Sequence, residues 1–209
     1  AMAMKLVYFD LRGKAEVLRL MLHVAGQEFD DCPGGVNKAD WDSQLLFGQL
    51  PLLIDGDRKI VQSGAIARYL ASKLNLCGST EDDKLLCDQL YEGAEDVFQA
   101  LWPACTKYRG GSPEALEKVL AEGGNVHKYL TRFNAILEGK KFFLGETFSY
   151  ADLALYNVLT LSSAIDVNNY IAPNFPNIKK HFDAVEAHPK IDAYNKSGKR
   201  RPPFEPFTF

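Results

Sequence analysis

The sequence predicts an α/β domain followed by an all-helical domain, and three observations lead to this fold class. Short runs of β-branched and aromatic residues, which are typical of strands, occur only before residue 76. Beyond Gly78 the apolar residues recur with helical spacing. The 209 residues, 46% hydrophobic and 24% charged, have an ordinary globular composition and suffice for two small domains. We therefore expect one domain at residues 1–76 and a second at residues 80–209.

The first domain is expected to have the order β-α-β-loop-β-β-α. Its segments are a strand at 5–9, a helix at 15–25 ended by Gly26, a strand at 27–32, a hairpin joining 50–54 to 59–61, and a helix with Ser63 as its N-cap. The hairpin turn is Asp55-Gly56-Asp57, a sequence that favours a tight reversal.

The second domain is expected to consist of helices alone. They run from Glu81 to about residue 108, from 113 to 137 with a loosening at Gly123-Gly124, from 150 to 165, and in two short segments bounded by Pro176 and Pro189. Ser149 and Asp152 have the spacing of a capping box at the start of the third helix.

Charge and cysteine usage argue against several classes of protein. The 24 basic and 27 acidic residues give a net charge of −3, unlike a strongly basic nucleic-acid binder. Cys32, Cys77, Cys87 and Cys105 lack C-x-x-C spacing, so we expect free, mostly buried thiols without zinc or dithiol chemistry. We expect no metal site and no membrane span, hence a cytoplasmic protein, and we interpret the basic residues 199–201 as a solvated tail.

Four features of the first domain have both a structural and a functional interpretation. Tyr8 is either a half-buried strand residue or a phenol at the strand end where α/β folds bind ligands. Leu50-Pro51 either begins a strand or forms a cis peptide that exposes backbone to a peptide ligand. Gln62-Ser63 is either a simple helix cap or a carboxylate site at a helix N-terminus. Trp41 is either a packing residue or the wall of a groove.

In order and spacing, three segments together resemble the cytosolic glutathione transferases. They are residues 8–16, 47–51 and 62–70, and the resemblance continues through 148–152 and 188–191 in the helical half. It is closest to the tyrosine-type sigma, pi and mu branch, with sigma the best match. It implies a thioredoxin-like N-terminal domain that binds glutathione as co-substrate, without a prosthetic group, and an all-helical domain that carries the electrophile pocket.

The resemblance also implies roles for individual residues. Tyr8 is the expected catalytic hydrogen-bond donor to the thiolate, assisted by Lys14. The expected glutathione-binding residues are Phe9, Trp41, Gln44, Gln49, Leu50, Pro51, Gln62, Ser63 and Asp96, the last reaching across a dimer interface. Trp102, Tyr108 and Phe209 are expected in the electrophile pocket, and Phe47 as the key that inserts into the partner of a homodimer.

Two positions depart from the family pattern. Lys14 stands where sigma members usually carry arginine, which keeps the charge and loses the planar fork. The segment between Trp41 and Phe47 lacks the lysine that often binds the glycyl carboxylate, leaving Gln44 as a weaker substitute. Because residues 1–76 carry 9 basic and 9 acidic residues, local donors must hold the anionic glutathione.

The implied function is a glutathione transferase that activates the thiolate for attack on hydrophobic electrophiles in detoxification. One alternative is a glutathione-dependent isomerase of the prostaglandin D synthase type, which regenerates glutathione and is distinguished by product analysis. Another is a non-catalytic ligand-binding or structural member of the fold, which a glutathione titration distinguishes. A thioredoxin-type redox role has no cysteine near Tyr8.

Overall fold

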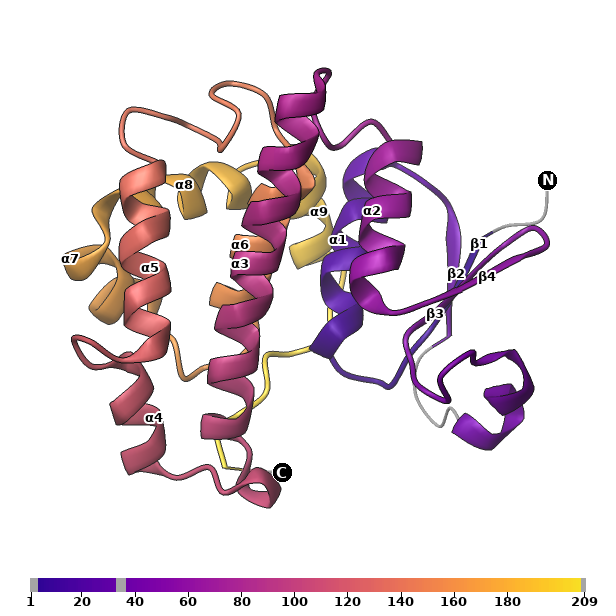
Figure 1. Cartoon of the computed structure of the whole chain (residues 1–209), viewed down its shortest axis with the longest axis horizontal. Helices are drawn as coiled ribbons and strands as arrows, with labels where there is room; N and C mark the ends of the chain where they lie inside the picture. The colour runs from indigo at the N-terminus through magenta and orange to yellow at the C-terminus, as the bar shows by residue number, and fades with distance from the viewer. Residues whose placement is uncertain (1–3, 33–36, 208–209) are drawn as a thin grey trace. The chain divides into compact units, whose positions relative to one another are not determined.

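The computed structural model describes residues 4–32 and 37–207, which fall into two compact units (Figure 1). The sheet unit comprises the described residues up to Leu76 together with Pro189–Pro202. The helical unit comprises Cys77–His188 and the described residues from Pro203 onward. The predicted domain boundary between residues 76 and 80 therefore does not separate the two units completely, because residues 189–202 belong to the sheet unit.

The sheet unit contains a four-stranded mixed sheet with the strand order β2-β1-β3-β4. Its strands are β1 (Met4–Val7), β2 (Phe29–Cys32), β3 (Leu52–Asp55) and β4 (Arg58–Val61). β1 runs parallel to β2 and antiparallel to β3, which forms the predicted hairpin with β4. This is the thioredoxin-like arrangement that the resemblance implied.

The helical elements of the sheet unit are η1 (Gly13–Ala15), α1 (Glu16–Ala25), η2 (Lys38–Gln44), α2 (Ser63–Lys73) and α9 (Pro189–Lys196). Gly26 ends α1 with a left-handed φ of +66°, as predicted. The predicted N-cap of α2 is wrong: Ser63 is already helical, and Gln62 is the cap. Gln62 has φ +71° and ψ 113°, so the chain enters helical geometry at Ser63, one residue earlier than a serine N-cap at this position predicts.

The helical unit is built around α6, whose residues are almost all buried. Its elements are α3 (Glu81–Cys105), η3 (Lys107–Arg109), α4 (Pro113–Leu120), α5 (Asn125–Ile136), α6 (Tyr150–Thr160), η4 (Val167–Ile171), α7 (Ala172–Asn174) and α8 (Pro176–Glu186). The helix expected at 113–137 is two helices, because Gly123 has φ +82° and the chain reverses there. A Cβ at Gly124 would lie 2.3 Å from the Lys118 carbonyl oxygen, so the turn is tight.

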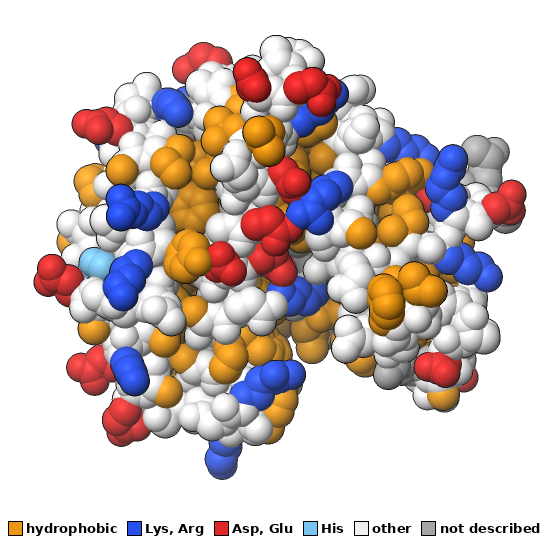
Figure 2. Space-filling view, in the orientation of Figure 1, with side chains coloured by type: hydrophobic (Ala, Val, Ile, Leu, Met, Phe, Trp, Pro, Cys, Tyr) orange, Lys and Arg blue, Asp and Glu red, His pale blue; other side chains and the backbone are white. Residues whose placement is uncertain are grey.

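The described surface and thiols match an ordinary globular protein. Basic and acidic side chains are interspersed on the face shown in Figure 2.

All four cysteines are free, three of them buried, and burial raises the pKa of Cys87 and of Cys105 to about 11. Within residues 4–32 and 37–207, no helix has the length and apolarity of a bilayer span, and no group of side chains has the makings of a metal site.

The start of α6 is held by the predicted capping box, which the structure confirms. The buried Asp152 carboxylate accepts hydrogen bonds from the backbone N–H groups of Ser149 and Phe143, at 2.8 and 2.9 Å, and from the Ser149 hydroxyl. Its Oδ1 also lies 2.9 Å from Nε2 of the buried His181 on α8. One carboxylate thus joins α6, the preceding loop and α8.

We expect Asp152→Ala to destabilise the protein by about 3 kcal/mol, because it leaves several buried donors without an acceptor. Ser149→Ala removes one hydroxyl of the same box and should cost about 1 kcal/mol. Urea unfolding followed by circular dichroism measures both free energies of unfolding. Equal losses in the two variants would contradict the central role of the carboxylate.

Candidate functional site

Three of the predicted site residues lie at one end of the sheet. Val7 pairs with Leu52, and Leu52 pairs with Val61. One step further along this antiparallel register, the chain positions are Tyr8, Pro51 and Gln62. Because neighbouring strands lie about 5 Å apart, these positions span about 10 Å across three strands. An extended tripeptide has a similar length.

The Tyr8 side chain is held against the η1 turn. It is 8% exposed, and its hydroxyl oxygen accepts a hydrogen bond of 3.1 Å from the Lys14 backbone N–H. Gly13 is buried with φ +42°, and a Cβ there would lie 2.6 Å from the Tyr8 hydroxyl oxygen. The Arg19 guanidinium carbon lies 6.0 Å from the centre of the phenol ring. The turn therefore fixes the height of the hydroxyl, and it places the Lys14 backbone N–H beside it.

The segment before β3 approaches the same end of the sheet. The Leu50-Pro51 peptide bond is cis, the geometry favoured by the functional interpretation of the motif. Leu50 and Trp41 pack on a small core made of Val7, Leu45, Leu52 and Val61. Trp41 is only half-buried, and Lys5 Nζ lies 5.9 Å from its ring centre. Trp41 thus both packs and presents a face to solvent, with half-buried Gln44 and exposed Gln49 nearby in the chain.

The N-terminus of α2 completes this end of the sheet. Gln62 is exposed, and no side chain caps the helix. A left-handed φ at a residue other than glycine costs on the order of 1–3 kcal/mol and is typical of functional sites. The backbone N–H groups of the first turn and the helix dipole give this end of α2, beside half-buried Ser63, a positive electrostatic potential.

The remaining predicted residues have separate surroundings. Phe9 is exposed, with its ring edge-on to Tyr8 at 5.4 Å. On α3, Asp96 accepts a hydrogen bond of 2.7 Å from the Tyr129 hydroxyl. Trp102 and Tyr108 lie close to each other. Side-chain hydrogen bonds from Arg109 and, as a smaller contribution, from Trp102 lower the pKa of the exposed Tyr108 phenol. Phe209 lies outside the described residues.

A group of buried charges in the sheet unit was not predicted from the sequence. Glu16 and Arg19 are fully buried on α1, although their i,i+3 spacing is that of an ordinary surface ion pair. The prediction of a solvated basic tail is wrong for two of its three residues. The Arg200 and Arg201 side chains are 7% and 11% exposed, because carboxylates of the sheet unit neutralise them. No local pattern in the sequence carries this information.

Comparison with known proteins gives matches over nearly the whole chain. The family described as "Glutathione S-transferase, N-terminal domain" matches residues 4–72, and "Glutathione S-transferase, C-terminal domain" matches residues 95–198. The chain is 34% identical to human "Glutathione S-transferase Mu 4", over 96% of this chain and 94% of the relative. It is 33% identical to Caenorhabditis elegans "Glutathione S-transferase P", over 97% of each. The solved pi-class glutathione S-transferase of Onchocerca volvulus superposes with a TM-score of 0.81, at 32% identity over 94% of this chain and 93% of that one.

Substituting Gly13 by alanine tests whether the η1 turn fixes the Tyr8 hydroxyl. The new methyl group would lie 2.5 Å from Leu11 Cδ1 and 2.6 Å from the Tyr8 oxygen, in a left-handed backbone. We expect a loss of about 2–4 kcal/mol in unfolding free energy and a shifted near-ultraviolet signal of Tyr8. Gly56→Ala is the matched control, because Gly56 has φ +59° and an added Cβ would have no atom within 4 Å. This variant therefore measures the cost of the left-handed backbone without any steric clash. Equal effects of the two variants would show that the approach to Tyr8 is unimportant.

Proposed function

The chain belongs to the glutathione S-transferase family, and on that premise we propose that Tyr8 activates the glutathione thiolate for attack on hydrophobic electrophiles. The named classes among the relatives are mu and pi, so the comparisons support a cytosolic enzyme of the pi/mu type and do not single out the sigma branch. They also do not favour the isomerase or the non-catalytic alternative. The observation that carries the proposal is the Tyr8 hydroxyl, clamped at 3.1 Å from the Lys14 N–H at the ligand-binding end of the sheet.

The chemistry requires a thiolate at neutral pH. A free thiol with a pKa near 8.5 is mostly protonated at pH 7, and only its anion attacks efficiently. The bond from Lys14 uses a lone pair of the Tyr8 oxygen, whereas a thiolate sulfur accepts the phenol O–H proton. One hydrogen bond to a charged group contributes about 1.5–3 kcal/mol, which corresponds to a thiol pKa lower by about one to two units. The sulfur then bonds to the electrophilic carbon while the leaving group departs with its electron pair.

The tripeptide fits along the three chain positions at the sheet end. We assign the cysteinyl part to the Leu50 backbone beside Pro51, and the γ-glutamyl carboxylate to the α2 N-terminus at Gln62 and Ser63. We assign the glycyl end of the tripeptide to Trp41, Gln44 and Gln49. In a homodimer, Asp96 reaches the γ-glutamyl amine of the neighbouring site. The hydrogen bond of 2.7 Å that Asp96 accepts from the Tyr129 hydroxyl orients its carboxylate.

The electrophile is assigned to aromatic side chains of the helical unit. Trp102 stacks on Phe98 at 5.8 Å and meets Phe204 edge-on at 4.8 Å, so its orientation is fixed. Tyr108 presents an exposed phenol of lowered pKa next to it. We also propose a detoxifying role in the cytoplasm, which membership of the glutathione S-transferase family supports.

Replacing Tyr8 by phenylalanine tests the activation step. We expect the absorbance band of bound glutathione thiolate at neutral pH to disappear and kcat/KM to fall roughly ten- to a hundredfold. The pH profile of kcat/KM should move to higher pH, because the bound thiol then ionises at a higher pKa. Tyr170→Phe is the control, since its hydroxyl donates to the Leu120 carbonyl within the helical unit. Full turnover in Tyr8→Phe with an unchanged profile would refute the assignment.

We also propose a homodimer in which Phe47 inserts into the partner subunit. Phe47 is 63% exposed in the single chain, next to Leu46, which is also exposed. Phe47→Ser should raise the dimer dissociation constant at least about tenfold, as measured by analytical ultracentrifugation over a concentration series. Ile136→Ser removes another exposed apolar side chain and should leave the dimer dissociation constant unchanged. Equal dissociation constants for Phe47→Ser and the parent protein would exclude Phe47 as the key.

A further inference from the structure

We propose that the C-terminal arginines Arg200 and Arg201 are positioning residues for thiolate activation, because they hold the loop that places the Tyr8 hydroxyl. The inference rests on the role of Tyr8 proposed above. We call the five side chains Glu16, Arg19, Asp31, Arg200 and Arg201 the charge clamp; all belong to the sheet unit.

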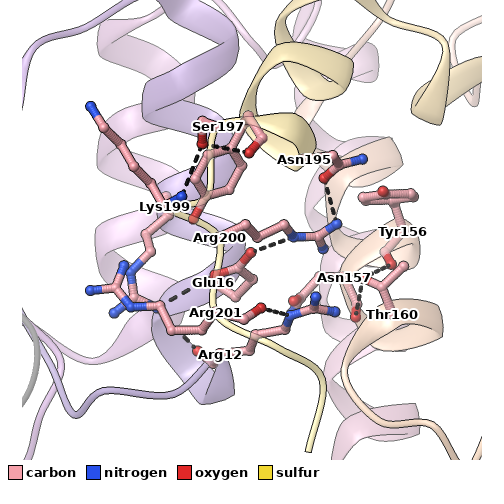
Figure 3. Close-up of polar contacts among 12 residues, drawn as sticks. Arg12, Glu16, Tyr156, Asn157, Thr160, Asn195, Ser197, Lys199, Arg200 and Arg201 are labelled. Carbon is pink, nitrogen blue, oxygen red and sulfur yellow. Dashed lines mark hydrogen bonds and ion pairs between the residues drawn. The ribbon is translucent and has the colours of Figure 1, made fainter.

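The first contact of the clamp joins the tail to the start of α1. The Arg200 Nε donates to Glu16 Oε1 at 2.9 Å, and its Nη1 donates to Asn195 Oδ1 at 2.7 Å (Figure 3). Glu16 is fully buried and is the first residue of α1, directly after the η1 turn. The position of Arg200 therefore fixes the end of that turn.

The second contact joins the tail to the loop between β1 and η1. The Arg201 guanidinium pairs with Asp31 at the end of β2, and its Nε donates to Asp10 at 3.1 Å. The Arg12 Nε donates to the Arg201 carbonyl oxygen at 2.7 Å, a bond visible in Figure 3. Two residues of the loop, Asp10 and Arg12, thus contact a single tail residue.

The third contact supports the same loop from inside the unit. The fully buried Arg19 donates through Nε to both Asp31 oxygens, at 3.0 and 3.2 Å, and through Nη1 to the Leu11 carbonyl at 3.0 Å. Asp31 therefore bridges Arg19 on the inner side and Arg201 on the outer side. The loop is held between two arginines that share one carboxylate.

The held loop has Tyr8 at one end and Lys14 at the other. The hydrogen bond from the Lys14 N–H to the Tyr8 oxygen closes it, with Gly13 in van der Waals contact beneath. A small displacement of residues 10–12 changes the distance between these two groups. A buried ion pair is weak evidence for stability, and in some proteins such pairs specify geometry instead. Here the geometry that they specify is that of the catalytic turn.

The test compares Arg201→Met and Arg200→Met with Lys199→Met, which removes the same charge from an exposed position of the same tail. In each purified protein, the thiolate absorbance of bound glutathione is titrated with pH. We expect the pKa of the bound thiol to rise by about one unit in both arginine variants, with about three- to eightfold less thiolate at pH 7. We expect kcat to fall accordingly, KM for glutathione to change less than about twofold, and Lys199→Met to match the parent protein.

A double variant separates positioning from general damage. If Arg201 acts through Tyr8, adding Arg201→Met to Tyr8→Phe should raise the thiol pKa no further. A lowered Tm with an unchanged thiol pKa in the arginine variants would overturn the inference. Should the methionine variants not fold, Arg200→Lys and Arg201→Lys, which keep the charge and lose the fork, decide by the same titration. If the parent protein shows no thiolate band, the proposed role of Tyr8 fails instead, so the two failures are distinguishable.

Discussion

The organisation of the sheet unit depends on one short contact, the approach of the Tyr8 hydroxyl to the turn at Gly13 and Lys14. It requires a residue without Cβ at Gly13, because a Cβ would lie 2.6 Å from the phenol oxygen. It also requires α1 to begin immediately afterwards, which places Glu16 in the interior, where a carboxylate must have a cationic partner. The buried arginines and the return of the chain at residues 198–202 meet this requirement.

The two units fix their geometry by different means. In the sheet unit, the register of β1, β3 and β4 places the ends of three strands side by side, so one end of the sheet collects chemically different groups. In the helical unit, the Asp152 carboxylate connects the cap of α6 to α8 through His181. In both units, a buried carboxylate with several donors defines where an element starts. Apolar packing stabilises the elements, but it does not specify such a starting point as sharply.

Much of the fold could be predicted because its signals are local. The hairpin at Asp55-Gly56-Asp57, the stop at Gly26 and the box of Ser149 with Asp152 each act within a few residues of the chain. The cap of α2 could not be predicted from Ser63, because the left-handed backbone of Gln62 arises where β4 ends and no side chain is needed as a cap. In the candidate site, Tyr8 and the cis Leu50-Pro51 bond follow from motifs, whereas the burial of Arg200 and Arg201 depends on carboxylates about 170 to 190 residues away in the chain.

The most buried charges of the sheet unit are paired locally, although the unit as a whole is basic. Residues 1–76 carry equal numbers of basic and acidic side chains, and residues 189–202 add five basic residues and one acidic residue. The most buried arginines of the unit are each paired with a carboxylate: Arg19 with Asp31, Arg200 with Glu16, and Arg201 with Asp10. Ion pairs of this kind set geometry, and their fields largely cancel at a distance. In the proposed site, oriented dipoles face the ligand: the N-terminus of α2 at one end of the three-strand row and the Tyr8 O–H at the other. Such fixed dipoles lose little by reorganisation when charge appears at a thiol sulfur, so a rigid turn suits the proposed chemistry better than a flexible basic segment.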